Sequence, residues 1–290
     1  MSEHVDEGWE EAGLDEYSTA AIIGTLNRFG VPLDEAGLKQ VLGERWPLEL
    51  AQEWKRTWTG TGDFASFPWE AANELCARFW PKRPTPRAIG TMVIEAIAHG
   101  QQLVAGRDTG LAAIWSSWEA QLAILPSGER RTALLGEVVV FLNRWFKPFN
   151  ATPVDLARSG HTEQALRFAQ MQETVYPERA GCITAKVRAL SGERAAALAD
   201  LTGWADEATR EVTARFSALE VLSWLEEYDL VKAHGLAVFD LAAKAEQWPL
   251  AHSIARVLAY AVANSPTDLT VAQQIAQRLE LAHGKTEHDD

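Results

Sequence analysis

Glu95 and His99 are the residues whose types and spacing come nearest to a chemical site. They lie four positions apart in a predicted helix, so their side chains share one face and could ligate a metal together. A metal site needs further ligands, and no second pair of this kind is visible in the sequence. Because Gly100 follows His99, we interpret His99 as a residue at a helix C-terminus, where positive charge suits the helix dipole. We therefore predict no metal site.

Signatures of common enzymes are missing elsewhere in the chain. There is no Gly-x-Ser-x-Gly elbow, no His-Glu-x-x-His pair, no phosphate loop and no Rossmann glycine triplet. Adjacent carboxylates such as Glu226 and Glu227 point about 100° apart on a helix, so they do not converge as a general acid and base would. Cys76 and Cys182 are isolated among apolar residues, which favours buried free thiols. We therefore expect no catalytic residue and no cofactor.

The balance of charge limits the partners that the chain can bind. Its 40 acidic and 27 basic residues give a formal net charge of -13. Such a chain is repelled by phosphate backbones and by anionic lipid, so we expect neither nucleic acid nor a membrane as a partner. No apolar run reaches the roughly 18 to 20 residues that cross a bilayer. Residues 1–16 carry acidic side chains and no Lys or Arg, unlike a secretory signal, so the expected location is the cytoplasm.

Almost every segment has the apolar spacing of an amphipathic helix, so the predicted fold class is all-α. Prolines interrupt this spacing at residues 81–87 and again at 147–153, and we place a domain boundary at the second break. The first predicted part is an acidic disordered tail at residues 1–16, followed by an irregular Trp-rich helical domain at residues 17–150. An array of helical hairpins follows at residues 151–284, and residues 285–290 form a polar tail.

Tryptophan is the anomaly of the composition, with 12 residues that lie mostly in the first half of the chain. Trp46, Trp54 and Trp58 share one helical stripe because they are spaced by multiples of four. The stripe is either a core of large side chains or part of a groove that binds a partner, since Trp is enriched among interface hot spots. His234 lies within a helical pattern and faces solvent or a partner. These four residues are the candidate partner contacts.

A spacing that occurs twice in the second half predicts tight pairing of helices. Gly160 precedes Ala165 by five residues, and Gly192, which lies 32 residues further on, precedes Ala197 by the same five. A Gly relieves a tight turn, and an Ala permits the close approach of two helices. With Pro177 as a closing residue after the first pair, the pattern resembles that of the tetratricopeptide-repeat superfamily of helical hairpins.

The resemblance covers residues 151–284, and it implies a short helical array whose surface binds another protein. Two further joints, Tyr228 to Ala233 and Glu246 to Ala251, keep the spacing of the helix starts but lack the glycine. Pro148 and Pro153 fall where the first helix of the first hairpin should run. The family's first-helix pattern of Trp, Leu-Gly and Tyr does not precede either glycine.

The function expected from these observations is non-enzymatic: an adaptor, scaffold or regulatory subunit that binds another protein. The contact surface would be the concave face of the array, a Trp-lined groove, or both, with an acidic rim that favours a basic partner. Two alternatives stay open. The chain could be an acidic immunity protein or secretion chaperone that captures a basic partner, or a helical enzyme whose site includes Glu95 and His99.

Overall fold

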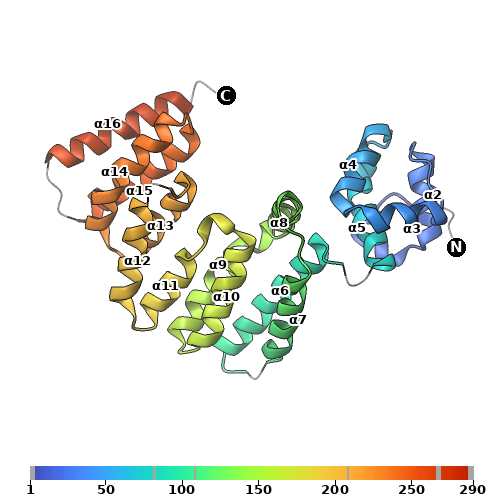
Figure 1. Cartoon of the computed structure of the whole chain (residues 1–290), viewed down its shortest axis with the longest axis horizontal. Helices are drawn as coiled ribbons and strands as arrows, with labels where there is room; N and C mark the ends of the chain where they lie inside the picture. Colours follow the sequence, from blue (N-terminus) through green and yellow to red (C-terminus); the bar gives the residue numbers. More distant parts are fainter. Residues whose placement is uncertain (1–3, 81–82, 108, 208, 266–268, 287–290) are drawn as a thin grey trace. The chain divides into compact units, whose positions relative to one another are not determined.

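A computed structural model of the chain describes residues 4–80, 83–107, 109–207, 209–265 and 269–286. These residues form helices and no strand, which confirms the predicted all-α class (Figure 1). The first helices are α1 Trp9–Ala12, α2 Thr19–Arg28, α3 Glu35–Glu44, α4 Pro47–Thr57, α5 Phe67–Phe79, α6 Pro86–Val104, α7 Leu111–Ala123 and α8 Glu129–Phe141. The later ones are α9 Phe146–Arg158, α10 Thr162–Val175, α11 Cys182–Leu190, α12 Arg194–Asp206, α13 Val212–Trp224, α14 Tyr228–Lys244, α15 Trp248–Asn264 and α16 Leu269–Thr286.

The helices belong to two compact units. The first unit comprises Met1–Glu95 and Ala112–Arg144, and the second comprises Ala96–Leu111 and Trp145–Asp290. The last change of unit, after Arg144, lies six residues before the boundary that we placed after residue 150. The sequence pattern gave no indication that residues 96–111 pack with the second unit. Within the described part of the chain, no helix combines the length and apolar character needed to cross a bilayer.

The acidic N-terminal segment is part of the first unit, which differs from the disordered tail that we expected. It forms α1 and a short 3-10 helix, η1, at Leu14–Glu16. Val5, Trp9 and Leu14 are each at most 3% exposed and join the core of this unit. The acidic residues of the segment surround these apolar anchors, and burial of the anchors outweighs the repulsion between the charges.

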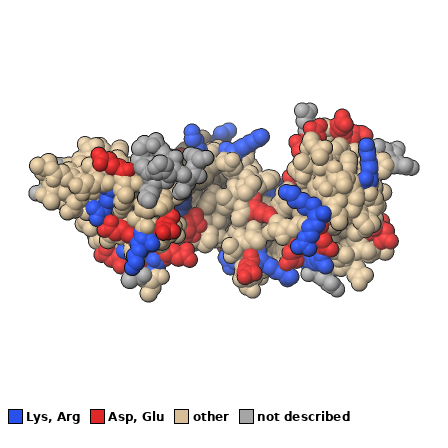
Figure 2. Space-filling model, turned by 90° about the horizontal axis from the view of Figure 1, so that it is seen from above, with Lys and Arg blue, Asp and Glu red and all other residues tan. Residues whose placement is uncertain are grey.

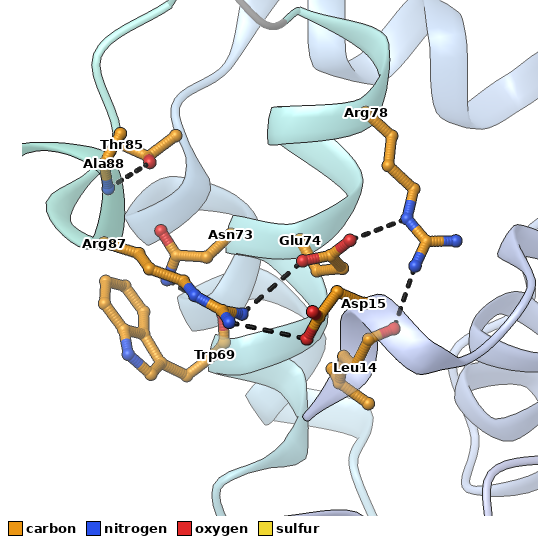
Figure 3. Close-up of polar contacts among 9 residues, drawn as sticks. All are labelled: Leu14, Asp15, Trp69, Asn73, Glu74, Arg78, Thr85, Arg87 and Ala88. Atoms are coloured by element: carbon orange, nitrogen blue, oxygen red, sulfur yellow. Dashed lines mark hydrogen bonds and ion pairs between the residues drawn. The ribbon is translucent and has the colours of Figure 1, made fainter. Parts of the chain in front are cut away.

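A network of charged side chains fastens this segment to α5 (Figure 3). The Glu74 side chain, which is largely buried, pairs with Arg78 Nε at 2.7 Å and with Arg87 at 3.5 Å. Arg78 also donates to the Leu14 carbonyl at 2.8 Å, and Arg87 reaches Asp15 at 3.5 Å. The two guanidinium groups therefore satisfy a carboxylate that would be costly to bury alone.

In the second unit, each helix from α9 to α16 packs against the next one along the chain. Alternate helices are also in contact, so that α9, α11, α13 and α15 form one layer while α12, α14 and α16 lie in the other (Figure 1). A continuous apolar core lies between the layers from α11 to α16. The unit is therefore a stack of sequential helix pairs.

Left-handed turns close the pairs. Gly160 has a φ of 83°, and the next residue, His161, donates its N–H to the carbonyl five positions back at 2.9 Å. Gly192 has a φ of 101°, and Glu193 repeats the bond at 3.0 Å. This is the Schellman arrangement, in which a left-handed residue ends a helix. The alanines that we predicted at the start of the second helices, Ala165 and Ala197, are fully buried.

The next pair uses the same turn without a glycine. Glu226 has a φ of 63°, Glu227 donates to the carbonyl five positions back, and Val231 is the fully buried residue. The joint that we assigned to Tyr228 to Ala233 was therefore placed two residues too late. At the joint between α14 and α15, Glu246 has a φ of 57° and Ala251 is fully buried, which is the spacing predicted there.

Helix α9 runs through the prolines that we expected to break it. Pro148 lies in the first turn, where no N–H is needed, but Pro153 lies inside the helix and leaves the Phe149 carbonyl without its usual donor. The Gln172 side chain of α10, which is 1% exposed, donates its Nε2 to that carbonyl instead. A long-range side chain thus replaces the missing backbone bond, and the helix continues.

The turn glycines offer a test of what closes the pairs. Added Cβ atoms at Gly192 and at helical, exposed Gly203 would meet nothing within 4 Å, so only Gly192 has a backbone reason to remain glycine. We expect G192A to lower the free energy of unfolding by about 1 kcal/mol and G203A to leave it unchanged or raise it by up to ~1 kcal/mol. Urea unfolding followed by circular dichroism measures both. Equal effects of the two substitutions would contradict a left-handed turn at Gly192.

The bond between Gln172 and the Phe149 carbonyl can be tested by a double-mutant cycle. In the natural background, Q172M leaves this buried carbonyl unpaired and should cost roughly 1–3 kcal/mol. In a P153A background, the alanine supplies the backbone N–H that proline lacks, so the cost of Q172M should be much smaller. Unfolding free energies of the four proteins give the coupling directly. A coupling of zero would show that Gln172 does not replace the missing donor.

Candidate functional site

We call the layer of α9, α11, α13 and α15 the inner layer of the second unit, and it contains a hollow between α9, α11 and α13. Its volume is about 320 Å³. Phe146 and Asn150 enter it from α9, Lys186 from α11, and Glu220 and Trp224 from α13. Val154, Ile183 and Val221 form its buried apolar floor.

A second hollow follows along the same layer, between α13 and α15. Its volume is about 410 Å³, and Phe216, Glu220, Ser253, Arg256 and Tyr260 are among its lining residues. Glu220 lines both hollows, so they adjoin. We call the two hollows together the array groove.

Exposed aromatic side chains line the array groove. Phe146 is 42% exposed, Trp224 is 38% exposed and Tyr260 is 55% exposed. Large aromatic groups on a surface mark sites of interaction when they gather in one hollow. All three come from the inner layer, which gives the groove its apolar character.

Basic side chains stack on these rings. Lys186 Nζ lies 3.7 Å from the centre of the Trp224 ring, and Arg158 Cζ lies 5.3 Å from the same centre. Arg179 Cζ lies 5.8 Å from the Phe146 ring and donates to Asn150 Oδ1 at 3.2 Å. Such contacts between cations and aromatic faces stabilise by roughly 0.5–2 kcal/mol each and hold the charged groups in place.

The walls of the groove shift the ionisation of its charged groups. The pKa of Lys186 is lowered to about 8, mainly by burial and also by the nearby Arg158 and Arg179, while Glu220 opposes the shift. Burial also raises the pKa of Glu220, against the effect of Arg179 and Lys186. Cys182 borders the groove but is fully buried, and burial raises the pKa of its thiol to about 12. Its sulfur therefore stays protonated at neutral pH and is a poor nucleophile.

The tryptophan stripe predicted as a partner surface is divided between core and surface. Trp54 is 5% exposed and belongs to the core of the first unit. Trp58 is partly buried, stacks on Phe67 with ring centres 5.7 Å apart, and donates to the Phe64 carbonyl. Trp46 directly precedes α4 and is the member of the stripe that lines a hollow.

The hollow beside Trp46 lies within the first unit, has a volume of about 250 Å³, and is lined by residues of α4 and α8. Glu137 reaches it from α8, and one of its carboxylate oxygens is buried without a hydrogen-bond partner. Burial raises the pKa of Glu137 to about 7. The other charged and polar side chains of the lining are Glu49, Gln52, Glu129 and Arg130, of which Arg130 and Glu49 pair with each other at 2.9 Å.

The remaining candidates lie away from the array groove. His234 belongs to α14, and its Nδ1 contacts Asp206 Oδ1 at 2.6 Å, which joins α14 to the end of α12. His99 lies inside α6 rather than at its end, so its interpretation as a C-terminal residue was wrong, and its Nδ1 is buried without a partner. Glu95 is exposed. Nowhere in the described ranges do three or more His, Cys, Asp or Glu side chains gather as metal ligands.

The array groove was missed at the sequence level, although a pattern marks part of it. Ser217, Glu220 and Trp224 on α13 are repeated 36 residues further on by Ser253, Arg256 and Tyr260 on α15, with the same spacing of three and four. This spacing places each set on one helical face. It could have been found beside the paired glycines.

On the face drawn in Figure 2, acidic and basic side chains lie interleaved in small clusters, without one large field of a single sign. The net charge therefore does not describe every local surface.

Comparison of the chain with protein-family models, with curated proteins and with solved structures found no match. The fold is an all-helical one with helices packed in sequential pairs, and the site must be interpreted from its own geometry.

Glu137 gives a pH-dependent test of the first unit. Its folded pKa of about 7 lies above its ordinary value of 4.5, so ionisation destabilises the fold increasingly as the pH rises from 4.5 to above 7. Replacement by a neutral amide removes this cost. We expect E137Q to match the natural protein at pH 4 and to exceed its unfolding free energy by about 1–2 kcal/mol at pH 8, after allowance for partial exposure. Urea unfolding at the two pH values checks this, and a pH-independent difference would contradict it.

Proposed function

We propose that this chain is a non-enzymatic adaptor that holds a segment of another protein in the array groove. The observation that carries the proposal is the inner layer of α9, α11, α13 and α15, which lines two adjoining hollows and exposes aromatic side chains into them. A groove of this size accommodates several residues of an extended or helical segment, with aromatic groups as anchors. The resemblance of the paired turns to tetratricopeptide-repeat hairpins supports a binding role by analogy alone.

The chemistry of the groove supports binding over catalysis. Its acidic group, Glu220, has no second carboxylate or histidine beside it in the lining, and its thiol, Cys182, is protonated at neutral pH. Lys186 is stacked on a ring rather than placed beside a base. These groups suit recognition, in which charge and apolar area are presented together.

The proposal can be tested by crosslinking from two matched positions in cells that express the chain naturally. A photoreactive phenylalanine analogue at Ser223, in the groove, should crosslink a partner protein, whereas the same analogue at Leu241, which is exposed on α14, should not. Purified partner should then bind the double variant W224A/Y260A at least tenfold more weakly, because two exposed anchors are lost.

The control for this test truncates two exposed apolar side chains outside the groove. L241A/L281A truncates exposed side chains of α14 and α16 and should leave the affinity unchanged. Circular dichroism establishes that both double variants are folded. If the folded W224A/Y260A protein binds its partner as tightly as the natural one, the array groove is not the binding surface.

A further inference from the structure

The basic side chains in and beside the array groove form no direct ion pair with a described carboxylate, although Glu220 interacts with Lys186 and Arg179 at longer range. Arg158, Arg179, Lys186 and Arg256 make no ion pair with any described carboxylate. Among the described residues of this unit, Arg107, Lys147, Arg215 and Lys244 also lack one, but they neither line a hollow nor, as Arg158 does, stack on the Trp224 ring. Most other basic residues of this unit are paired, namely Arg167, Arg188, Arg194, Arg210, Lys232 and Arg278. The groove therefore concentrates uncompensated positive charge.

Aromatic rings hold three of these cations in position. The Trp224 ring contacts both Lys186 and Arg158, and Arg179 is held by the rings of Phe146 and Tyr176. An aromatic face fixes a cation without using its N–H groups as a carboxylate would. Apart from the bond that Arg179 donates to Asn150, the donors therefore stay available to an anionic ligand, and little side-chain entropy remains to be lost when it binds.

The local charge is opposite to that of the whole chain. Three cations, Arg179, Lys186 and Arg256, line the groove against one carboxylate, Glu220, which gives the lining a local charge of about +2 when all are ionised, in a chain of net charge -13. Arg158 adds a further positive charge beside the groove, on the Trp224 ring. Such a site attracts acidic groups, while the rest of the surface repels long polyanions such as nucleic acids. The apolar floor and exposed aromatic rings meanwhile require apolar groups beside the acidic ones.

We propose that the occupant of the array groove is an acidic peptide segment, in which Asp or Glu alternates with aromatic or large aliphatic residues. Its carboxylates pair with Arg158, Arg179 and Lys186, and its apolar side chains pack on Trp224 and Tyr260. This inference rests on the proposed function. It replaces the basic partner that the net charge led us to expect, because salt screens charges beyond about one Debye length, so a bound ligand interacts mainly with the charges nearest to it.

Selection from a displayed library of random 12-residue peptides tests the inference while the cellular partner is still unidentified. The full chain should enrich peptides rich in Asp and Glu next to Phe, Trp or Leu. The strongest of these peptides, labelled with fluorescein, should bind R158Q/K186Q at least tenfold more weakly by fluorescence anisotropy. The matched variant R167Q/K244Q removes two cations from α10 and α14, which do not line the groove. It should bind the peptide as the natural protein does.

The pH dependence of peptide affinity, through the charge of Lys186, is a measurement that a merely structural effect of the substitutions would not change. Between pH 7 and 9 this lysine loses its charge, while Arg158 and Arg179 stay charged and Tyr176 stays neutral because burial raises its pKa. Glu220 also faces Lys186, and burial raises its pKa from the ordinary value of 4.5. The carboxylates of the peptide are ionised throughout this range. The affinity should therefore fall severalfold, and at most about tenfold, between pH 7 and 9. K186R, which keeps its charge, should remove most of this fall.

The possible outcomes separate the inference from the proposed function. Enriched peptides that are neutral or basic, but lose binding to W224A/Y260A, overturn the acidic ligand and retain the groove as a binding surface. The absence of any peptide whose binding depends on the groove overturns both. Tighter binding of a twelve-nucleotide single-stranded thymidine oligomer than of any selected peptide also overturns the acidic peptide as occupant.

Discussion

The left-handed turn is the constraint on which the second unit depends. Where one residue takes a positive φ and the next bonds five positions back, the chain reverses and the following helix packs against the one before it. Repetition of this reversal returns every second helix to the same side. The described residues show this turn between α9 and α10, α11 and α12, α13 and α14, and α14 and α15. Together with the remaining connections, these turns let α9, α11, α13 and α15 lie in one layer beside a common groove.

The two units use their aromatic residues in different ways. In the first unit Trp9 packs edge-on against Phe67, and Trp58 stacks on the same ring, so the rings fill a core. In the second unit Trp224 and Tyr260 remain exposed, and Trp224 carries cations on its face. The abundance of tryptophan is thus explained mainly by packing, and the proposed interaction surface is made by aromatic residues outside the tryptophan stripe.

The helical fold and the turns at Gly160 and Gly192 were predictable because helical periodicity and the steric freedom of glycine are local properties. The turn at Glu226 was misplaced, since a glutamate gives no local sign that its φ is positive. The continuity of α9 was beyond local rules, because the donor that replaces the missing N–H of Pro153 comes from Gln172, 19 residues away in the sequence.

The candidate site was harder to predict than the fold, for a physical reason. A stripe of large side chains at helical spacing looks the same in sequence whether another helix covers it, as at Trp54, or nothing does, as at Trp224. What separates the two cases is whether another element packs over the stripe in the folded chain, and the spacing along one helix does not determine this. The net charge was similarly uninformative, because it averages over ion pairs and hides the cations that have none.

The sequential packing of the second unit also has a consequence for how it folds. Its helices contact their nearest and next-nearest neighbours along the chain, so most of its tertiary contacts join residues that are close in sequence. Chains with such local contacts fold quickly and can begin folding at any of several pairs, with structure spreading from one pair to the next. At the turns at Gly160, Gly192 and Glu226, a helix that has already folded then provides the surface on which the following helix forms.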